Sequence, residues 1–204
     1  MLADLDQVAG VLPSLAAPAL ARITGRKTCP VATYLRLAQE VASLDVSSAQ
    51  AEDFRRRFNG YYGVRRNEAW RIQYYAAFQL AKDSLDPAAD LFASVLKEMN
   101  GLQGRTEASF ASKLVATLRP ESPVIDSVVR SFLRRYVTLP TIQGHDSACA
   151  FYRQLSWAMS ELSASPQAHA WSANFDAAFA NVPGAAGIHA VKKLDFLIWA
   201  GAER

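Results

Sequence analysis

Apolar residues recur at every third or fourth position along nearly the whole chain, and this periodicity limits what the chain can fold into. The segment 67–82 shows the pattern clearly, with five apolar side chains on one stripe of a helix: Trp70, Tyr74, Ala77, Phe78 and Ala81. No segment combines alternating apolar and polar residues with the turn signals of a hairpin. The pattern therefore predicts an all-α protein, a compact globular bundle of about nine or ten helices.

Start and stop signals divide this pattern into separate helices. Asp86-Pro87 and Ser122-Pro123 each place a capping side chain before a proline, which is typical of a helix start. Asn59-Gly60 and Asn100-Gly101 are typical helix ends. We expect helices over these segments: 30–44, 48–58, 67–82, 87–99, 105–118, 123–137, 145–163, 170–181 and 187–200.

The chain is long enough to bury one generous core. Half of its 204 residues are apolar and a fifth are charged, which is the usual balance of a globular protein. No internal repeat, low-complexity tract or linker divides the sequence. We therefore expect a single helical domain over residues 1–204.

Several features predict a cytoplasmic protein. No apolar run reaches the roughly 20 residues that a membrane-spanning helix needs. Asp4 and Asp6 stand where a signal peptide would carry basic residues. Cys29 and Cys149 lie far apart in unremarkable contexts, which argues for a reducing compartment and against a disulfide framework.

Positive charges gather in two zones of a chain whose net charge is only +3. The zone 54–71 holds six arginines: Arg55, Arg56, Arg57, Arg65, Arg66 and Arg71. The zone 105–135 holds six cations: Arg105, Lys113, Arg119, Arg130, Arg134 and Arg135. Two such zones fit one face that binds an anion, of which nucleic acid is the commonest large example, and they fit two solvated helix faces equally well.

The motifs of several enzyme classes are missing from the sequence. His145, His169, His189 and the two cysteines lack the spacing of zinc ligands. There is no glycine-rich phosphate loop after a strand, no nucleophile elbow and no HExxH. These absences argue against metal hydrolases, kinases and nucleotide-fold enzymes, and we expect neither a metal nor an organic cofactor.

One stretch, within residues 87–137, combines a glycine turn with the start of a helix. Gly101 and Gly104 lie between the predicted end of one helix and the start of the next. Glycines let the backbone approach a ligand closely, and amides at the start of a helix can donate to a DNA phosphate. Asp126 follows about twenty residues later, in the first turn or so of another helix, where the dipole favours a carboxylate.

This arrangement resembles the helix-hairpin-helix superfamily of DNA glycosylases, whose members carry a glycine hairpin between two helices and a catalytic aspartate beyond it. Over about forty residues, 101–106 match the hairpin and Asp126 matches the aspartate in its Pro-Val-x-Asp setting. The glycines are separated by two residues where the usual hairpin has one. The position of the Schiff-base lysine of bifunctional members falls near Thr106 or Glu107, so the resemblance implies a monofunctional enzyme.

A wider segment resembles a group of small glycosylase-like proteins of bacterial defence loci. The similar elements are Tyr-Tyr-x-Val-Arg-Arg-Asn over 61–67, the segment 107–113 that ends in Ser-Lys, and Pro-x-x-Asp-Ser over 123–127. This resemblance implies excision of glucosylated hydroxymethylcytosine from phage DNA as antiviral defence, with an abasic site as the product.

The glycosylase interpretation assigns a role to each candidate residue. Asp126 would stabilise the positive charge that builds on the sugar and activate water, and Lys113 would hold a phosphate or orient Asp126. The expected DNA-binding residues are Gly101, Gly104, Arg105, Thr106, Arg65, Arg66 and Asn67, of which the turn, Arg65, Arg66 and Arg105 should share one face. The expected residues of the base pocket are Tyr61, Tyr62 and Trp70. We expect the protein to act as a monomer on DNA.

Other interpretations fit the same residues. Asp126 would also serve as a helix cap or as the partner of an arginine, and Lys113 as a core lysine that reaches solvent. The aromatic residues of 58–74 would also fit a hydrophobic core. The alternatives to an enzyme are a non-catalytic helical protein that binds nucleic acid or regulates, and a helical module that binds a protein through one apolar face. An enzyme requires Asp126 at the floor of a concave cleft with Lys113 and the glycine hairpin on its rim. In a binding protein the carboxylate would point at an arginine, or the surface would be flat.

Overall fold

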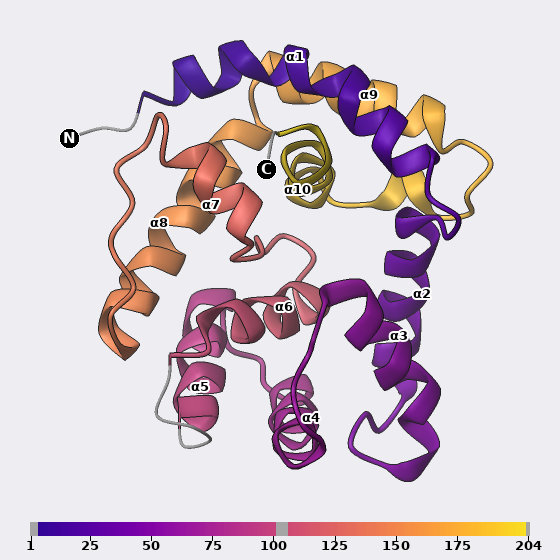
Figure 1. The fold of residues 1–204 in the computed structure, drawn as a ribbon, viewed down its shortest axis with the longest axis vertical. Helices are drawn as coiled ribbons and strands as arrows, with labels where there is room; N and C mark the ends of the chain where they lie inside the picture. Colours follow the sequence, from indigo (N-terminus) through magenta and orange to yellow (C-terminus); the bar gives the residue numbers. More distant parts are fainter. Residues whose placement is uncertain (1–3, 101–105, 203–204) are drawn as a thin grey trace.

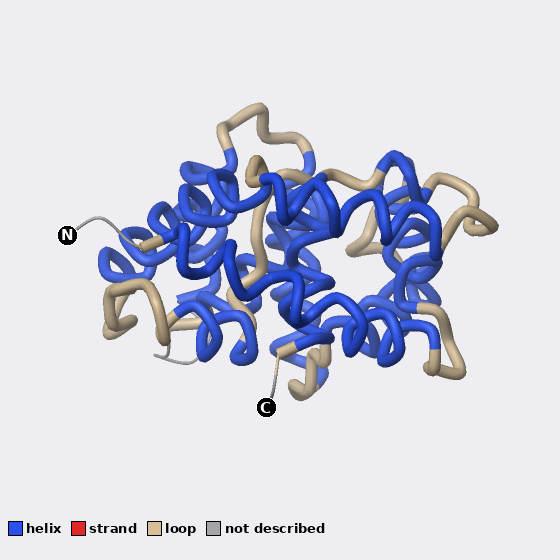
Figure 2. The backbone as a smooth tube through the Cα atoms, turned by 90° about the horizontal axis from the view of Figure 1, so that it is seen from above, coloured by secondary structure: helices blue, strands red, loops and turns tan. Residues whose placement is uncertain are grey.

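The computed structural model describes residues 4–100 and 106–202, which form α-helices, two short 3-10 helices and loops, with no strand in these ranges (Figures 1 and 2). The prediction of an all-α protein with nine or ten helices is confirmed for this part of the chain. The elements are α1 (Leu5–Thr24), α2 (Pro30–Ser43), η1 (Ala49–Ala51), α3 (Glu52–Tyr62), α4 (Glu68–Lys82), α5 (Ala88–Asn100), α6 (Ala108–Leu118), α7 (Ser127–Leu133), α8 (His145–Ser163), α9 (Pro166–Ala178), η2 (Ala185–Gly187) and α10 (Ala190–Gly201).

Helix α10 lies at the centre of the fold. It packs against α1, α7, α8 and α9, and Figure 1 shows it nearly along its axis with these helices around it. Nine of its twelve residues are buried. A helix that is covered on all sides is expected to be apolar all round. The charged residues that α10 carries in this position, Lys192, Lys193 and Asp195, therefore require an explanation.

Helix α1 is absent from the sequence-based prediction. Pro13 and Pro18 lie inside it, and prolines normally argue against a helix interior. Packing overrides that preference, because α1 buries Leu12 and Ile23 in a close contact with α9 and α10. At Gly201 the two helices approach so closely that an added Cβ would lie 2.6 Å from the Leu15 carbonyl oxygen.

The predicted end of a helix at Asn59-Gly60 is wrong. Helix α3 continues through both residues and ends at Gly63, whose φ of 65° is the left-handed conformation that glycine adopts without strain. The extra turn is stabilised by packing, since the rings of Phe58 and Tyr62 lie 4.8 Å apart between centroids. This turn carries Tyr61 and Tyr62 toward the centre of the molecule.

Two predicted starts are also wrong. The segment 123–126 is not helical, and α7 begins at Ser127, because the Ile125 amide donates to Ser112 Oγ (2.9 Å) instead of entering a helix. Helix α9 begins at Pro166, four residues before the predicted start, and the Ser165 hydroxyl caps it. In both places a side chain accepts an amide hydrogen bond and thereby sets where the helix starts.

Among the helices that the structure describes, none has the length and apolar character that crossing a membrane requires. Cys29 and Cys149 are both free thiols, so they form no disulfide with each other. The buried apolar side chains form one connected cluster that extends from Val8 to Ala202. The described residues thus share one core.

Candidate active site

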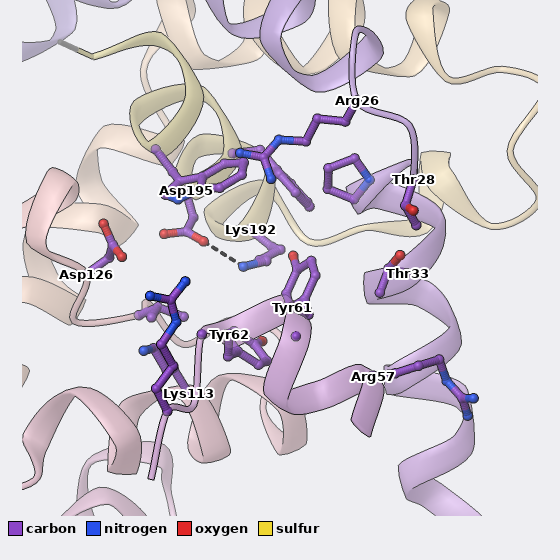
Figure 3. Close-up of a pocket in the computed structure, with 17 residues that line it drawn as sticks. Arg26, Thr28, Thr33, Arg57, Tyr61, Tyr62, Lys113, Asp126, Lys192 and Asp195 are labelled. Atoms are coloured by element: carbon purple, nitrogen blue, oxygen red, sulfur yellow. Dashed lines mark hydrogen bonds and ion pairs between the residues drawn. The ribbon is translucent and has the colours of Figure 1, made fainter. Parts of the chain in front are cut away.

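A cavity of about 680 Å³ lies where α2, α3, α6 and α10 and the segment before α7 face one another (Figure 3). Five cations line it: Arg26, Arg57, Arg65, Lys113 and Lys192. Two carboxylates line it as well, Asp126 and Asp195, together with the aromatic residues Tyr61, Tyr62, Phe196 and Trp199. Cations outnumber acids, so the cavity is suited to an anionic ligand.

Asp126 was predicted in the first turn of a helix over 123–137, but it is the N-cap residue of α7, one position before the first turn. Its Oδ1 accepts a hydrogen bond from the Val128 amide (2.7 Å), which fixes the carboxylate at the cavity wall. Among the described residues, no arginine forms an ion pair with it. Asp126 therefore caps α7 and also lines the cavity. Within the described part of the chain, its carboxylate forms no ion pair with a cation.

Lys113 projects into the same cavity from α6. Its ammonium lies 4.9 Å from the centroid of the Phe110 ring. Burial lowers the pKa of Lys113, and attraction to the Asp126 carboxylate partly opposes that shift. Thr106 was predicted inside a helix over 105–118, but it precedes α6, whose N-cap residue is Glu107.

Tyr61 and Tyr62, which were predicted to form a base pocket, line the cavity from the last turn of α3. Their rings lie 4.7 Å apart in an edge-on arrangement. Burial raises the pKa of both phenols, so both are neutral at pH 7. The two side chains thus offer flat, uncharged surfaces beside the carboxylates.

Trp70 does not line the cavity, which corrects the third residue of the predicted base pocket. It is 2% exposed and stacks on Tyr74 at 5.0 Å between ring centroids. The reason is its place in α4, where the apolar stripe faces the core rather than the cavity.

Arg66 and Asn67, predicted to bind DNA, make contacts within the protein. Arg66 Nη2 donates to both carboxylate oxygens of the buried Glu107, at 2.7 and 2.8 Å. The Asn67 side chain caps α4 by accepting from the Trp70 amide (2.9 Å). Arg65, by contrast, lines the cavity. Gly101, Gly104 and Arg105 lie outside the described residues, so the predicted common face is not defined.

Lys192 and Asp195 are functional candidates that the sequence analysis did not identify. Lys192 Nζ lies 2.6 Å from Asp195 Oδ2, and the two side chains are only 4% and 10% exposed (Figure 3). Burial alone would lower the pKa of Lys192, but the Asp195 carboxylate raises it well above the ordinary value. The sequence shows that Lys192 and Asp195, three residues apart, share one face of a mostly apolar helix, but this spacing does not tell that the face meets a cavity.

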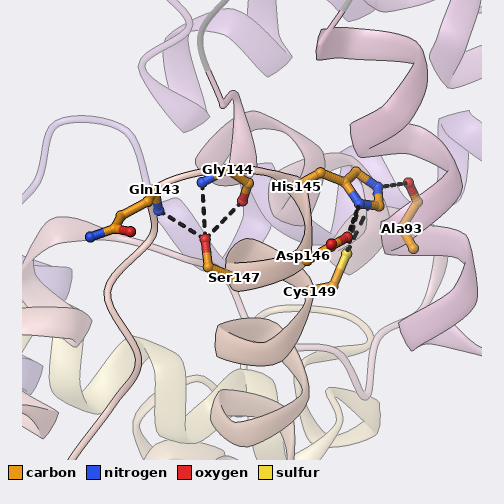
Figure 4. Close-up of polar contacts among 7 residues, drawn as sticks. All are labelled: Ala93, Gln143, Gly144, His145, Asp146, Ser147 and Cys149. Atoms are coloured by element: carbon orange, nitrogen blue, oxygen red, sulfur yellow. Dashed lines mark hydrogen bonds and ion pairs between the residues drawn. The ribbon is translucent and has the colours of Figure 1, made fainter.

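His145 and Cys149 form a second polar cluster at the start of α8 (Figure 4). His145 Nε2 lies 3.2 Å from the Ala93 carbonyl and its Nδ1 3.1 Å from Asp146 Oδ1, so the ring links α8 to α5. Burial raises the pKa of Cys149, which keeps the group as a thiol rather than a nucleophilic thiolate. In the described part of the chain, no three histidines, cysteines or acids are grouped so that they could hold a metal ion.

Comparison with known proteins assigns no family to this site. No protein-family model, curated protein or solved structure matches the chain. The function of the cavity must therefore be argued from its own residues and from the motifs in the sequence.

Proposed function

We propose that the protein is a monofunctional DNA glycosylase that excises a modified base and leaves an abasic site. The observation that carries the proposal is the meeting of Asp126, Lys113 and Tyr61 in one cavity, to which α3, α6 and the N-cap of α7 each contribute one of these side chains. This is the concave arrangement that separates an enzyme from a flat binding surface.

The cavity residues match the steps of base excision. A glycosylase rotates its target nucleotide out of the duplex, and the flat faces of Tyr61 and Tyr62 suit a base that has left the stack. Arg26 and Arg65 at the cavity supply positive charge for the phosphates on either side, whereas Arg57 pairs with Glu40.

Asp126 has the chemistry that bond cleavage requires. Breaking the N-glycosidic bond builds positive charge on the sugar, and a fixed carboxylate stabilises that charge and accepts a proton from the attacking water. The hydrogen bond from the Val128 amide holds the group in place before the reaction, so little reorganisation is needed. Lys113, attracted to Asp126, would orient the carboxylate or hold a phosphate.

The size of the cavity is sufficient for a base with a bulky substituent. Its volume of about 680 Å³ lies in the upper half of the range of roughly 300–1,000 Å³ that is usual for small-molecule sites. Together with the resemblance to defence glycosylases, this supports glucosylated hydroxymethylcytosine in phage DNA as the substrate. In this account the protein acts in the cytoplasm as a monomer, without a metal or an organic cofactor.

A second candidate is a non-catalytic protein that binds nucleic acid or regulates. The observation that favours it is the helix cap, because the hydrogen bond to Val128 gives Asp126 a structural role without any reaction. In that case the cations of the cavity would bind phosphate and the carboxylate would only terminate α7.

Incubation with modified DNA separates the two candidates. Duplexes that each carry one modified cytosine or purine, including glucosylated hydroxymethylcytosine, are incubated with the protein and scored for abasic sites. A glycosylase produces abasic sites in at least one duplex, and it produces no strand nick or borohydride-trapped adduct. Binding of the duplexes without any abasic site would support the second candidate and contradict the first.

A further inference from the structure

The ammonium of Lys192 has only part of its hydrogen-bonding capacity filled within the protein. An ammonium carries three N–H donors, and among the described residues Asp195 Oδ2 is the one acceptor that bonds it. Four aromatic rings lie around it, with their centroids 5.1–5.9 Å from Nζ: Phe196, Tyr34, Tyr61 and Tyr62. The group also lines the cavity, so a ligand there can accept a hydrogen bond from it.

Burying the ion pair of Lys192 and Asp195 costs more free energy of folding than a purely structural feature would justify. Removing an ammonium and a carboxylate from water costs several kcal/mol for each ion, and apolar side chains of similar size usually give equal or better stability. Apart from Lys193, which pairs with Asp176 of α9, the other buried residues of α10 are apolar, and no second helix is joined by the ion pair of Lys192 and Asp195. The pair is therefore best explained by what it does in the cavity.

The charge state of Lys192 is fixed by its neighbours. The groups that face it are Asp195 on α10, Tyr34 on α2, and Tyr61 and Tyr62 on α3. Burial raises the pKa of Tyr34 to about 12 and raises those of Tyr61 and Tyr62, so the three phenols are neutral at pH 7. Burial raises the pKa of Asp195, and the Asp195 carboxylate raises the pKa of Lys192, so the cavity wall carries the two groups as an ion pair at pH 7.

We infer that Lys192 is a second catalytic group, whose ammonium binds the carbonyl oxygen beside the glycosidic nitrogen and stabilises the negative charge on the departing base. Asp195 is a positioning residue that holds the ammonium in place. The inference rests on the proposed glycosylase function and extends it to the leaving group. Asp126 would act on the sugar and Lys192 on the base, and Figure 3 shows the Asp195 carboxylate between these two residues.

The step balances without a further reactant. The bond between C1′ and the base nitrogen breaks, and its electron pair leaves with the base, where the charge spreads onto the neighbouring carbonyl oxygen. Water adds to C1′, Asp126 accepts the proton, and that proton ends on the base. Lys192 keeps its own proton throughout. The proposed role of Lys192 therefore requires a pyrimidine base. In a pyrimidine O2 lies beside the glycosidic nitrogen, whereas a purine has no carbonyl there.

The test compares excision by the parent protein with that by Lys192→Met/Asp195→Leu, in which both charges are replaced by apolar groups of similar size. The substrates are duplexes with a single glucosylated 5-hydroxymethylcytosine, 5-hydroxymethylcytosine, 5-fluorocytosine or 5-formylcytosine. We expect the double variant to lose about 10²–10³-fold in single-turnover rate on the glucosylated base. The loss of rate in the double variant should be smaller on any of these bases that leaves more easily, because a more stable departing anion depends less on stabilisation by Lys192. Lys193→Met, a neighbour outside the cavity, should excise at the parent rate.

A second variant tests positioning by Asp195. In Asp195→Asn, burial acts on Lys192 without its carboxylate, so the pKa of the ammonium falls and the alkaline limb of the rate profile should move to lower pH. A merely structural role would leave that limb in place. Parent-like rates in the double variant, or an equal loss on every leaving group, would overturn the inference but not the glycosylase function. Failure of the parent to excise any of the bases would overturn both.

Discussion

Lys192 and Lys193 are neighbours in α10 and both are buried, but their surroundings differ. Lys192 bonds Asp195 one helical turn away and lines the cavity. Lys193 bonds Asp176 of α9 and the Ala186 carbonyl, outside the cavity. The second ion pair joins two helices, whereas the first lies within one helix, and the described contacts of its ammonium outside that helix are with aromatic rings on α2 and α3. A buried ion pair that joins no two elements is the one to examine for function.

Arg65 and Arg66 repeat this contrast on the other side of the cavity. Arg66 ties the start of α4 to the start of α6 through Glu107, while Arg65 lines the cavity. Two adjacent charges therefore differ in role because, within residues 4–100 and 106–202, Arg66 has an ion-pair partner and Arg65 has none.

The largest difference should appear in stability at the two lysines. Lys192→Met leaves Asp195 buried without a partner, and we expect a loss of about 3–5 kcal/mol in the free energy of unfolding. Lys193→Met should cost about 1 kcal/mol, because Asp176 is 35% exposed and water can solvate it. Denaturant unfolding of both variants and of Lys192→Met/Asp195→Leu measures the difference. The double variant should recover most of the loss, and equal losses in the two single variants would break the comparison.

Substitution of Arg66 should lower the stability of the protein, whereas substitution of Arg65 should weaken DNA binding. Arg66→Met leaves the buried Glu107 carboxylate unpaired and should cost about 2–3 kcal/mol of stability. Arg65→Met should change stability by less than about 0.5 kcal/mol but weaken DNA binding and lower its salt dependence by about one phosphate contact. Salt titrations of duplex affinity provide the readout. If Arg65→Met leaves the affinity unchanged at low and high salt, the cavity rim is not a DNA-binding surface.

A smaller effect of opposite sign is expected at Lys113. Its pKa is lowered in the folded protein, so at pH 7 the charged form opposes folding. Lys113→Met should therefore raise the free energy of unfolding at pH 7. The gain should fade as the pH rises through the lowered pKa toward the ordinary value of 10.5, where the amine is neutral in both states. A variant that is less stable than the parent at pH 7 would show that Lys113 supports the fold.

Apolar periodicity and cap signals predicted most of the helices, and the segment 145–163 coincides with α8. The prediction failed where distant contacts decide the local structure. Packing on α10 keeps α1 helical in spite of Pro13 and Pro18, and Gly63 rather than Asn59-Gly60 ends α3. Propensity is a weak guide where such contacts exist.

The candidate site was predictable only in part, for a similar reason. Motif spacing identified Asp126, Lys113, Tyr61 and Tyr62, all of which line the cavity. It could not identify Lys192 and Asp195, because nothing in the spacing of α10 tells which face meets a cavity. Nor could it separate Arg65 from Arg66, whose partner Glu107 lies 41 residues away in the sequence.

The excision rate of Asp126→Asn tests the central claim most directly. The asparagine oxygen can still accept the Val128 hydrogen bond, so the cap and the fold should be retained, but no charge opposes the cation on the sugar. We predict a loss of about 10²–10³-fold in single-turnover excision, with DNA affinity nearly unchanged. Asp146→Asn, which alters an exposed carboxylate at the start of α8, should excise at the parent rate. Excision by Asp126→Asn at the parent rate would contradict the account.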